Sequence, residues 1–229
     1  MESHLYQSQL LCRHLQAAKR CRQVYYESES NVSLHVDRSR RNAILAVKGT
    51  STPHHWQNNL MMGVNDLQAH KGFWKYAREC VADLRKAHPK FVKEELLEGG
   101  RLCMTAHSSG SAALTMCLYE MMRNHEIRNL LRNWEIELVM FGSPRPGKKP
   151  FVHEFNRLLR ENEHVQVYRY EVSMDIASGF PPIPGYKHVG GHYLELKAHP
   201  LGDPYANHSI SNYIQNMEFL IESEEERSN

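Results

Sequence analysis

The chain has 229 residues, of which 41% are hydrophobic and 24% are charged, and its formal net charge is +2. This length and apolar content suit one globular domain with a sizeable core, and they exclude an intrinsically disordered chain. The balanced charge provides no basic stripe of the kind that binds nucleic acids. We therefore expect a folded protein without a nucleic-acid partner.

The N-terminus and the cysteines favour a location inside the cell. The first residues are polar and lack the layout of a signal peptide, and no apolar run approaches the roughly 18 residues that a membrane span needs. The five cysteines are odd in number and show no C-x-x-C spacing, so neither a disulfide framework nor a zinc site is predicted. We expect a soluble, cytoplasmic protein with buried thiols and without a transmembrane segment.

Residues 1–41 are predicted to form a helical segment that packs on the rest of the molecule. Apolar residues recur at helical spacing in a helix expected from about Leu5 to Ala18. The segment is also basic, which favours a solvated face and leaves contact with a lipid surface as the alternative. Its basic residues include Arg13, Lys19, Arg20, Arg22, Arg38, Arg40 and Arg41.

After residue 41, apolar strand patterns alternate with helical ones. Strands without a polar face are typical of an α/β fold with a mostly parallel central sheet flanked by helices. The expected strands are Ala43–Val47, Leu102–Ala106, Ile136–Phe141 and Val165–Val172, with Tyr193–Leu196 as a candidate edge strand. The expected helices are Gly72–Ala87, Ser109–Arg123, Pro150–Asn162 and Ile210–Glu222. We expect residues 1–229 to form a single domain, with the acidic residues 223–229 as a flexible tail.

A serine stands between the strand that ends at Ala106 and the helix that follows it. Ser108 has Ala106 two residues before it and Gly110 two residues after it, as a tight nucleophile turn requires. Ser109 is a rival nucleophile, but choosing it would put His107 at a position that needs a small residue. The N-terminus of the following helix would offer the Ser109 backbone N–H to a developing oxyanion. A polar loop without chemistry is the alternative.

A nucleophilic serine needs a base and an acid that orients the base, and in such folds the acid precedes the histidine. Asp175 lies just past the strand Val165–Val172, where catalytic groups are commonly presented. The downstream histidines are His188, His192, His199 and His208. His208 is preferred on position alone, because it lies on a loop just before the last helix.

Several motifs, in one order, resemble those of class 3 lipases, the α/β-hydrolase family of fungal triacylglycerol lipases and their diacylglycerol lipase and feruloyl esterase relatives. The similarity extends from about Ala43 to Tyr213. Lys48 and Ala106 replace the family's arginine and glycine, and Ser109 and Ser111 replace leucine and glycine. The motifs are Val47-Lys48-Gly49-Thr50, His70-Lys71-Gly72-Phe73, Ala106-His107-Ser108-Ser109-Gly110-Ser111, Phe141-Gly142-Ser143-Pro144-Arg145, the segment 175–190 and Asn207-His208-Ser209-Ile210-Ser211-Asn212-Tyr213.

The resemblance implies an α/β-hydrolase fold and a serine carboxylester hydrolase. Ser108 would be the nucleophile, His208 the base and Asp175 the acid that orients it. Thr50 would donate its backbone N–H and hydroxyl to the oxyanion, beside the Ser109 N–H. The implied mechanism requires no metal and no organic cofactor.

The segment after Thr50 resembles the helical lid of the family. Trp56, Leu60 and Met61 fall on one apolar stripe, which would cover the acyl groove or meet a lipid surface. An ordinary core-facing helix is an equal alternative. Most of the other residues in the segment are polar, which argues against strong interfacial activation. The implied substrates are acylglycerol or phospholipid acyl esters. The alternatives are an esterase for short or aromatic soluble esters, or a lipase-like interaction protein without catalysis.

Overall fold

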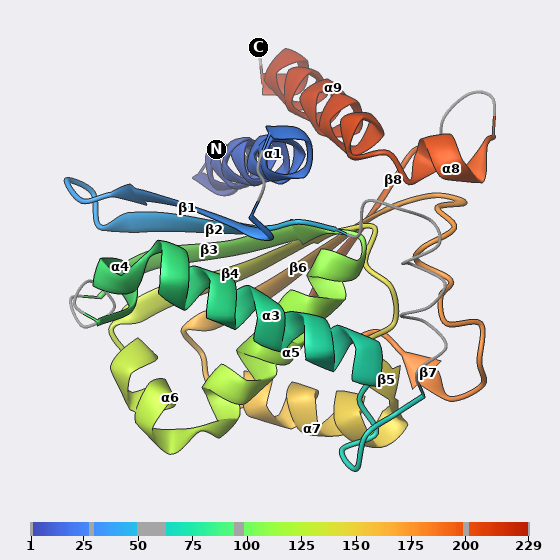
Figure 1. The fold of residues 1–229 in the computed structure, drawn as a ribbon. Coiled ribbons are helices and arrows are strands. Elements are labelled where there is room, and N and C mark those ends of the chain that lie inside the picture. Colours follow the sequence, from blue (N-terminus) through green and yellow to red (C-terminus); the bar gives the residue numbers. More distant parts are fainter. Residues whose placement is uncertain (1, 28–29, 50–62, 94–98, 199–201, 229) are drawn as a thin grey trace.

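A six-stranded sheet forms the centre of the protein (Figure 1). The computed structural model describes residues 2–27, 30–49, 63–93, 99–198 and 202–228. In spatial order the strands are β1 (Val32–Asp37), β2 (Asn42–Val47), β3 (Gly100–His107), β4 (Trp134–Phe141), β6 (Val165–Val172) and β8 (His192–Leu196). Strand β1 is antiparallel to β2, and the other five strands are parallel to one another. The carboxyl ends of five strands therefore share one edge of the sheet, where the candidate site lies.

Helices cover both faces of the sheet (Figure 1). On one face, α1 (Glu2–Glu27) and α9 (Ile210–Ser228) lie side by side. The short helix α8 (Pro204–Asn207) precedes α9 in the chain. The other face carries α3 (Lys71–Ala87), α4 (Pro89–Lys93), α5 (Ser109–Arg123), α6 (His125–Leu131) and α7 (Lys149–Arg160). Two short strands, β5 (Gly147–Lys148) and β7 (Tyr186–Lys187), pair antiparallel beside this layer.

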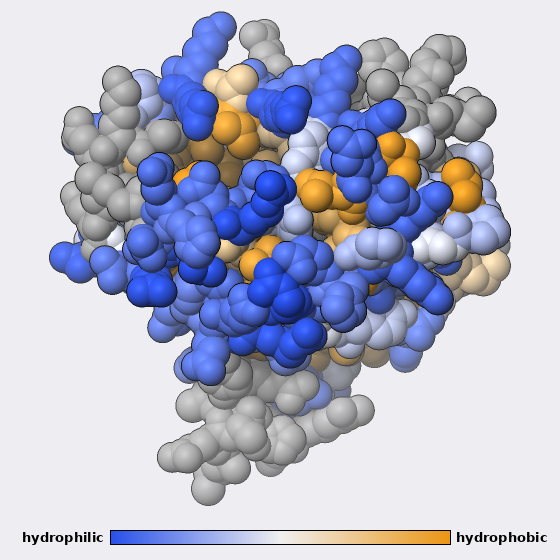
Figure 2. Space-filling model, turned by 90° about the horizontal axis from the view of Figure 1, so that it is seen from below, coloured by the Kyte–Doolittle hydropathy of each residue, from blue (hydrophilic) through white to orange (hydrophobic). Residues whose placement is uncertain are grey.

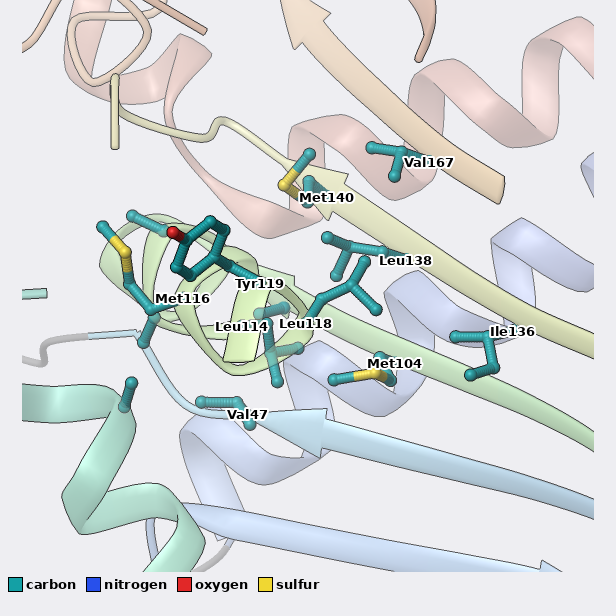
Figure 3. Packing of buried hydrophobic residues seen from close by; sticks show 14 of the residues in the cluster. Val47, Met104, Leu114, Met116, Leu118, Tyr119, Ile136, Leu138, Met140 and Val167 are labelled. Carbon is teal, nitrogen blue, oxygen red and sulfur yellow. The ribbon is translucent and has the colours of Figure 1, made fainter. Parts of the chain in front are cut away.

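Each face of the sheet has its own hydrophobic core, because successive side chains of a strand point to opposite faces. On β4, Leu138 and Met140 belong to the core under α5, where Leu114 and Leu118 meet them (Figure 3). Val139, between them, belongs to the core under α1 and α9. The central strands are thus buried on both sides, which explains why their sequences lack a polar face.

Local sequence signals set several helix ends. The His70 ring Nδ1 accepts from the backbone N–H groups of Gly72 and Phe73, at 3.1 and 3.4 Å, and so caps the start of α3. Asn124 ends α5 and caps α6, since its Oδ1 accepts from the N–H groups of Glu126 and Ile127. A proline stands in the first turn of α7, where its missing N–H costs nothing.

The predicted α/β architecture is confirmed, and the predicted strands and helices occur with their ends shifted by at most a few residues in most cases. Residues 1–41 are not helical throughout: α1 extends to Glu27, and β1 follows it as an edge strand. In the acidic segment for which the sequence predicted a flexible tail, α9 continues to Ser228. Glutamate is a good helix former, which explains the extension. None of the helices in the described ranges has an apolar stretch that could cross a membrane.

Candidate active site

Ser108 stands in a sharp turn between β3 and α5. Its backbone angles, φ 59° and ψ −137°, lie outside the regions that ordinary residues adopt. The turn is held by a hydrogen bond of 2.9 Å from the Ser108 N–H to the Phe141 carbonyl oxygen on β4. A Cβ atom at Gly110 would come within 2.7 Å of the Lys48 carbonyl oxygen. The small residue predicted after Ser108 is therefore required by the close approach of β2 to α5.

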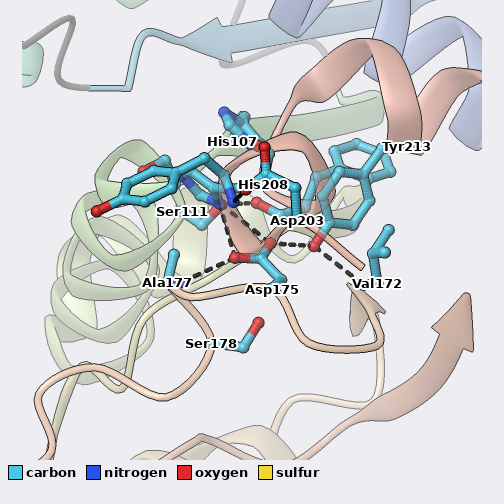
Figure 4. Close-up of polar contacts among 12 residues, drawn as sticks. His107, Ser111, Val172, Asp175, Ala177, Ser178, Asp203, His208 and Tyr213 are labelled. Atoms are coloured by element: carbon cyan, nitrogen blue, oxygen red, sulfur yellow. Dashed lines mark hydrogen bonds and ion pairs between the residues drawn. The ribbon is translucent and has the colours of Figure 1, made fainter. Parts of the chain in front are cut away.

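The structure brings Ser108, His208 and Asp175 together in one hydrogen-bonded chain. His208 Nε2 lies 2.9 Å from Ser108 Oγ. On the other side of the ring, His208 Nδ1 lies 2.9 and 3.0 Å from the two carboxylate oxygens of Asp175 (Figure 4). This geometry suits the tautomer in which Nδ1–H donates to Asp175 and Nε2 accepts from the serine hydroxyl. The three groups come from β3, the β6 end and the α8–α9 junction, about 100 and 33 residues apart in the chain.

The carboxylate of Asp175 is buried and accepts hydrogen bonds from two further groups. The Tyr213 hydroxyl donates to Oδ2 at 2.5 Å, and the Ala177 N–H donates to Oδ1 at 2.7 Å (Figure 4). Burial by itself raises the pKa of this carboxyl. The hydrogen bond to His208 and the His208 charge, followed by the hydrogen bonds from Tyr213 and Ala177, outweigh burial and hold the pKa below its ordinary value. Asp175 is therefore a carboxylate at neutral pH, as a group that orients an imidazole must be.

His107 is buried beside His208 and stays neutral. Burial, followed by the neighbouring His208, lowers the pKa of His107 from 6.5 to about 3. Its Nε2 lies 2.7 Å from the His208 carbonyl oxygen, and because that oxygen can only accept, the proton is on Nε2. The two rings lie 4.5 Å apart between centroids, tilted by 30°. His107 thus fixes the backbone and one ring face of His208 without adding a positive charge.

Tyr213, His107 and Gly142 are the residues of this site that the sequence did not assign to it. The Tyr213 hydroxyl also accepts from the Val172 N–H at 3.1 Å, so it links α9 to the end of β6. Gly142 has φ +55°, and a Cβ there would approach Asp175 Oδ2 to 2.6 Å. All three residues lie within the recognised motifs, which was the available signal, but their contacts run between distant segments.

The remaining predicted site residues are placed as follows. Ser109 is buried as the first residue of α5, consistent with an N–H at the helix N-terminus. Thr50 and the candidate lid residues Trp56, Leu60 and Met61 lie outside the described residues. Gly49, which precedes Thr50, packs against the nucleophile turn, since a Cβ there would lie 3.2 Å from Ser108 Cβ.

The other histidines that the sequence left open do not contact Ser108 in the described structure. His188 Nε2 lies 3.0 Å from the Ser178 carbonyl oxygen, and burial lowers the pKa of this ring to about 4. His192 begins β8, so it lies at the opposite end of the strand from the candidate site, stacked on Tyr168. His199 lies outside the described residues. Position in the chain therefore selected the histidine that meets the serine.

A family model described as "Lipase (class 3)" matches residues 44–184, which is more than half of the chain. The chain belongs to the class 3 lipase family. This match includes Ser108 and Asp175, whereas His208 lies beyond it. No sequence among curated proteins matches this chain significantly.

Solved structures of fungal lipases share the fold of this chain. The Lip2 lipase of Yarrowia lipolytica is 16% identical with a TM-score of 0.58, over 72% of this chain and 60% of its own. The lipase of Rhizopus microsporus var. chinensis is 17% identical with a TM-score of 0.60, over 84% of this chain and 74% of its own. A fungal lipase in complex with an inhibitor, described as a model for interfacial activation in lipases, is 17% identical with a TM-score of 0.61, over 83% and 80%.

The predicted α/β-hydrolase fold is confirmed by these neighbours and by the mostly parallel sheet. The chain spans only 60% of the length of the Yarrowia lipase chain. At these identities the likeness concerns the fold, and the activity has to be argued from the site itself.

Proposed function

We propose that this protein hydrolyses carboxylic esters through an acyl-enzyme formed on Ser108. The observation that carries the proposal is the hydrogen-bonded chain from Ser108 through His208 to Asp175, with separations of 2.9 Å and 2.9–3.0 Å. These separations are within the range that proton transfer to and from a catalytic base requires. Membership of the class 3 lipase family supports an ester as the substrate.

The reaction has two steps. The Ser108 oxygen attacks the ester carbonyl carbon while His208 Nε2 takes the hydroxyl proton, and the tetrahedral intermediate collapses as His208 returns that proton to the leaving alcohol. Water then attacks the acyl-serine with His208 again as the base, and the carboxylic acid leaves as the Ser108 hydroxyl forms again. Asp175 holds the Nδ1–H tautomer and stabilises the imidazolium in both steps.

The oxyanion would be stabilised beside the nucleophile turn. Ser109 begins α5, where backbone N–H groups and the helix dipole favour negative charge. Gly49 packs against the same turn, and the next residue in the chain, Thr50, would supply the second donor. Loss of one such donor typically costs on the order of 10²–10³ in kcat.

We propose acylglycerol or phospholipid acyl esters as the substrate class, and the family and the fungal lipase fold support this. Contact with a lipid surface would rest on the apolar stripe of Trp56, Leu60 and Met61. An esterase for short soluble esters and an interaction protein without turnover are the alternatives that experiment must separate from it.

Hydrolysis of p-nitrophenyl esters with acyl chains of increasing length tests the proposal. We expect turnover of long-chain esters, and a loss of about 10⁴-fold or more in Ser108→Ala. The matched control is Ser109→Ala, which removes the rival hydroxyl but keeps its backbone N–H and should retain most activity. Turnover limited to acetate and butyrate would indicate an esterase, whereas equal rates for wild type and Ser108→Ala would contradict the mechanism.

A further inference from the structure

A surface groove lies between α3 and α5, apart from the candidate active site. It consists of two depressions of about 780 and 500 Å³ that share Trp74, Arg78, Ala82 and Glu120 among their lining residues. None of the three residues proposed for catalysis lines either depression. The groove belongs to the helical layer beneath the sheet. On this side of the molecule, Figure 2 shows hydrophobic patches within a mainly hydrophilic surface.

The floor of the groove is apolar and partly exposed. Trp74 and Val81 of α3 line it from one side, and Met121 of α5 lines it from the other. Trp74 is held in place by an edge contact with the Tyr119 ring, 6.0 Å between centroids. Ile127 of α6, which is 37% exposed, also lines the groove. Such a floor favours an apolar ligand surface.

The rim of the groove is net basic, with five cations against the carboxylates of Asp66, Glu79 and Glu120. Lys71, Arg78 and Arg85 line it at seven-residue intervals, so all three lie on nearly the same side of α3. Within the described part of the chain, these three exposed side chains have no ion pair. The other two cations of the rim are paired, Lys75 with Glu79 and Arg123 with Glu120. The rim therefore offers three cations to a ligand.

The dimensions of the groove suit a helix. From Lys71 to Arg85, α3 extends for about 21 Å, the length of a helix of roughly 14 residues. A groove between two helices, with an apolar floor and a charged rim, is the usual receptor for one face of an amphipathic helix. The apolar floor residues are less exposed than the cations around them, which suits a protruding helix better than a flat bilayer.

We propose that the α3–α5 groove binds an acidic amphipathic helix of a partner protein. The partner would insert apolar residues at positions i, i+3 or i+4, and i+7 between Trp74 and Met121, and place carboxylates opposite Lys71, Arg78 and Arg85. The acidic end of this chain's own α9 lies on the opposite face of the sheet, so it does not fill the groove of the same molecule (Figure 1). The proposal does not depend on ester hydrolysis.

Selection from a displayed library of helical peptides about 16 residues long, with the full chain as target, tests the proposal. We expect the selected peptides to be acidic, to carry apolar residues at helical spacing, and to bind less tightly as salt is raised. Arg78→Glu/Arg85→Glu should weaken their binding at least about tenfold, whereas the control Arg22→Glu/Lys90→Glu, with the same change of charge at exposed sites elsewhere, should not. A photo-reactive leucine in the peptide should cross-link to wild-type protein at Trp74 or Met121, which needs no variant.

Three results would overturn the proposal. The first is that no peptide is selected, or that the selected peptides lack net negative charge or bind both double variants equally. The second is self-association of wild type, measured by sedimentation, that Arg78→Glu/Arg85→Glu abolishes, because a second copy would then occupy the groove. The third is binding to phosphatidylserine-containing vesicles that the same variant abolishes in the absence of peptide binding, because the face would then meet a lipid surface.

Discussion

The position of the Asp175 carboxylate is fixed by contacts with four residues. The carboxylate lies against the backbone of Gly142, the hydroxyl of Tyr213 and the N–H of Ala177, in addition to His208. Each contact restricts the position of Oδ1 or Oδ2 and thereby the orientation of the imidazole. Such preorganisation is what a base needs if its ring is not to turn away from the serine.

Gly142→Ala should reduce ester turnover strongly. The added Cβ would come within 2.6 Å of Asp175 Oδ2 and 3.1 Å of His208 Nδ1, and the φ of +55° is unfavourable for alanine. We therefore expect a lower kcat with little change in KM, together with a loss of roughly 1–2 kcal/mol in the free energy of unfolding.

The matched control for this change is Gly179→Ala, where the nearest atom to an added Cβ is 3.8 Å away. Steady-state kinetics and urea denaturation of both variants check the prediction. Wild-type kcat in folded Gly142→Ala would show that the position of Asp175 does not control the reaction.

The sequence predicted the three residues proposed for catalysis, but it did not predict the residues that hold them in position. Ser108 is recognisable by its small neighbours, Asp175 by its position after a strand, and His208 by its position before the last helix. The structure places the three side chains together. Tyr213 was visible only as the last residue of the motif that contains His208. Its role follows from α9 docking across the end of β6, and no local pattern encodes such a contact.

Among the elements, α1 docks on the sheet through a polar anchor as well as apolar residues. Arg13 donates to Glu137 of β4 at 3.3 Å, and His14 Nδ1 lies 2.6 Å from the Tyr170 hydroxyl of β6. Arg13, which the sequence placed on a solvated or lipid-binding face, thus contributes to this docking. Because a buried polar contact forms in only one register, the pair fixes how α1 lies along the sheet.

Strand β1 was missed for a reason that concerns edge strands in general. Most of its residues Val32–Asp37 are half-buried and His35 is exposed. Because Ser33 and His35 are polar, the strand lacks the continuous apolar run of the central strands. Its position is set by pairing with β2 and by contact with α3 rather than by its own sequence. Central strands can be predicted from composition, whereas such an edge strand cannot.

Ala18→Leu should destabilise the docking of α1. Ala17 and Ala18 are fully buried where α1 approaches the sheet, so a larger side chain has no space without moving the helix. We expect the free energy of unfolding to fall by about 1–3 kcal/mol. Gln16→Leu, at an exposed position of the same helix, should change it by less than about 0.5 kcal/mol. Equal stability of the two variants in urea denaturation would contradict the tight contact.

For the whole molecule, histidines that stay neutral in the folded protein predict that the free energy of unfolding decreases at acidic pH. Burial lowers the pKa of His107 to about 3 and that of His188 to about 4, from 6.5, and burial lowers the pKa of His14 as well. Between these values and 6.5, the unfolded chain binds protons that the folded chain does not. The free energy of unfolding should therefore decrease as the pH falls from about 6.5 towards 4.

Urea denaturation at a series of pH values between about 7.5 and 4 measures this dependence. His188→Gln should flatten the decrease, because it removes one group that gains a proton only on unfolding. His153→Gln, at an exposed position of α7, is the control and should leave the slope unchanged. An identical slope in wild type and His188→Gln would contradict the assignment.

The whole molecule contains two hydrophobic cores, the candidate site at the carboxyl ends of the parallel strands, and the groove between α3 and α5. The sheet could be predicted from local apolar patterns, and the site residues from the nucleophile turn, their order in the chain and the family resemblance. The sequence did not indicate the groove, whose basic and apolar residues come from two helices that meet only in the folded chain.

The most direct test of the central claim is the location of covalent labelling by a fluorophosphonate, read by peptide mass spectrometry. A serine activated by His208 and Asp175 should react stoichiometrically, and we expect the added mass on Ser108 in the peptide that spans the β3–α5 turn. Ser108→Ala should not be labelled, and Ser109→Ala should be labelled like wild type. Labelling on Ser109, or no labelling of the folded wild-type protein, would contradict the account.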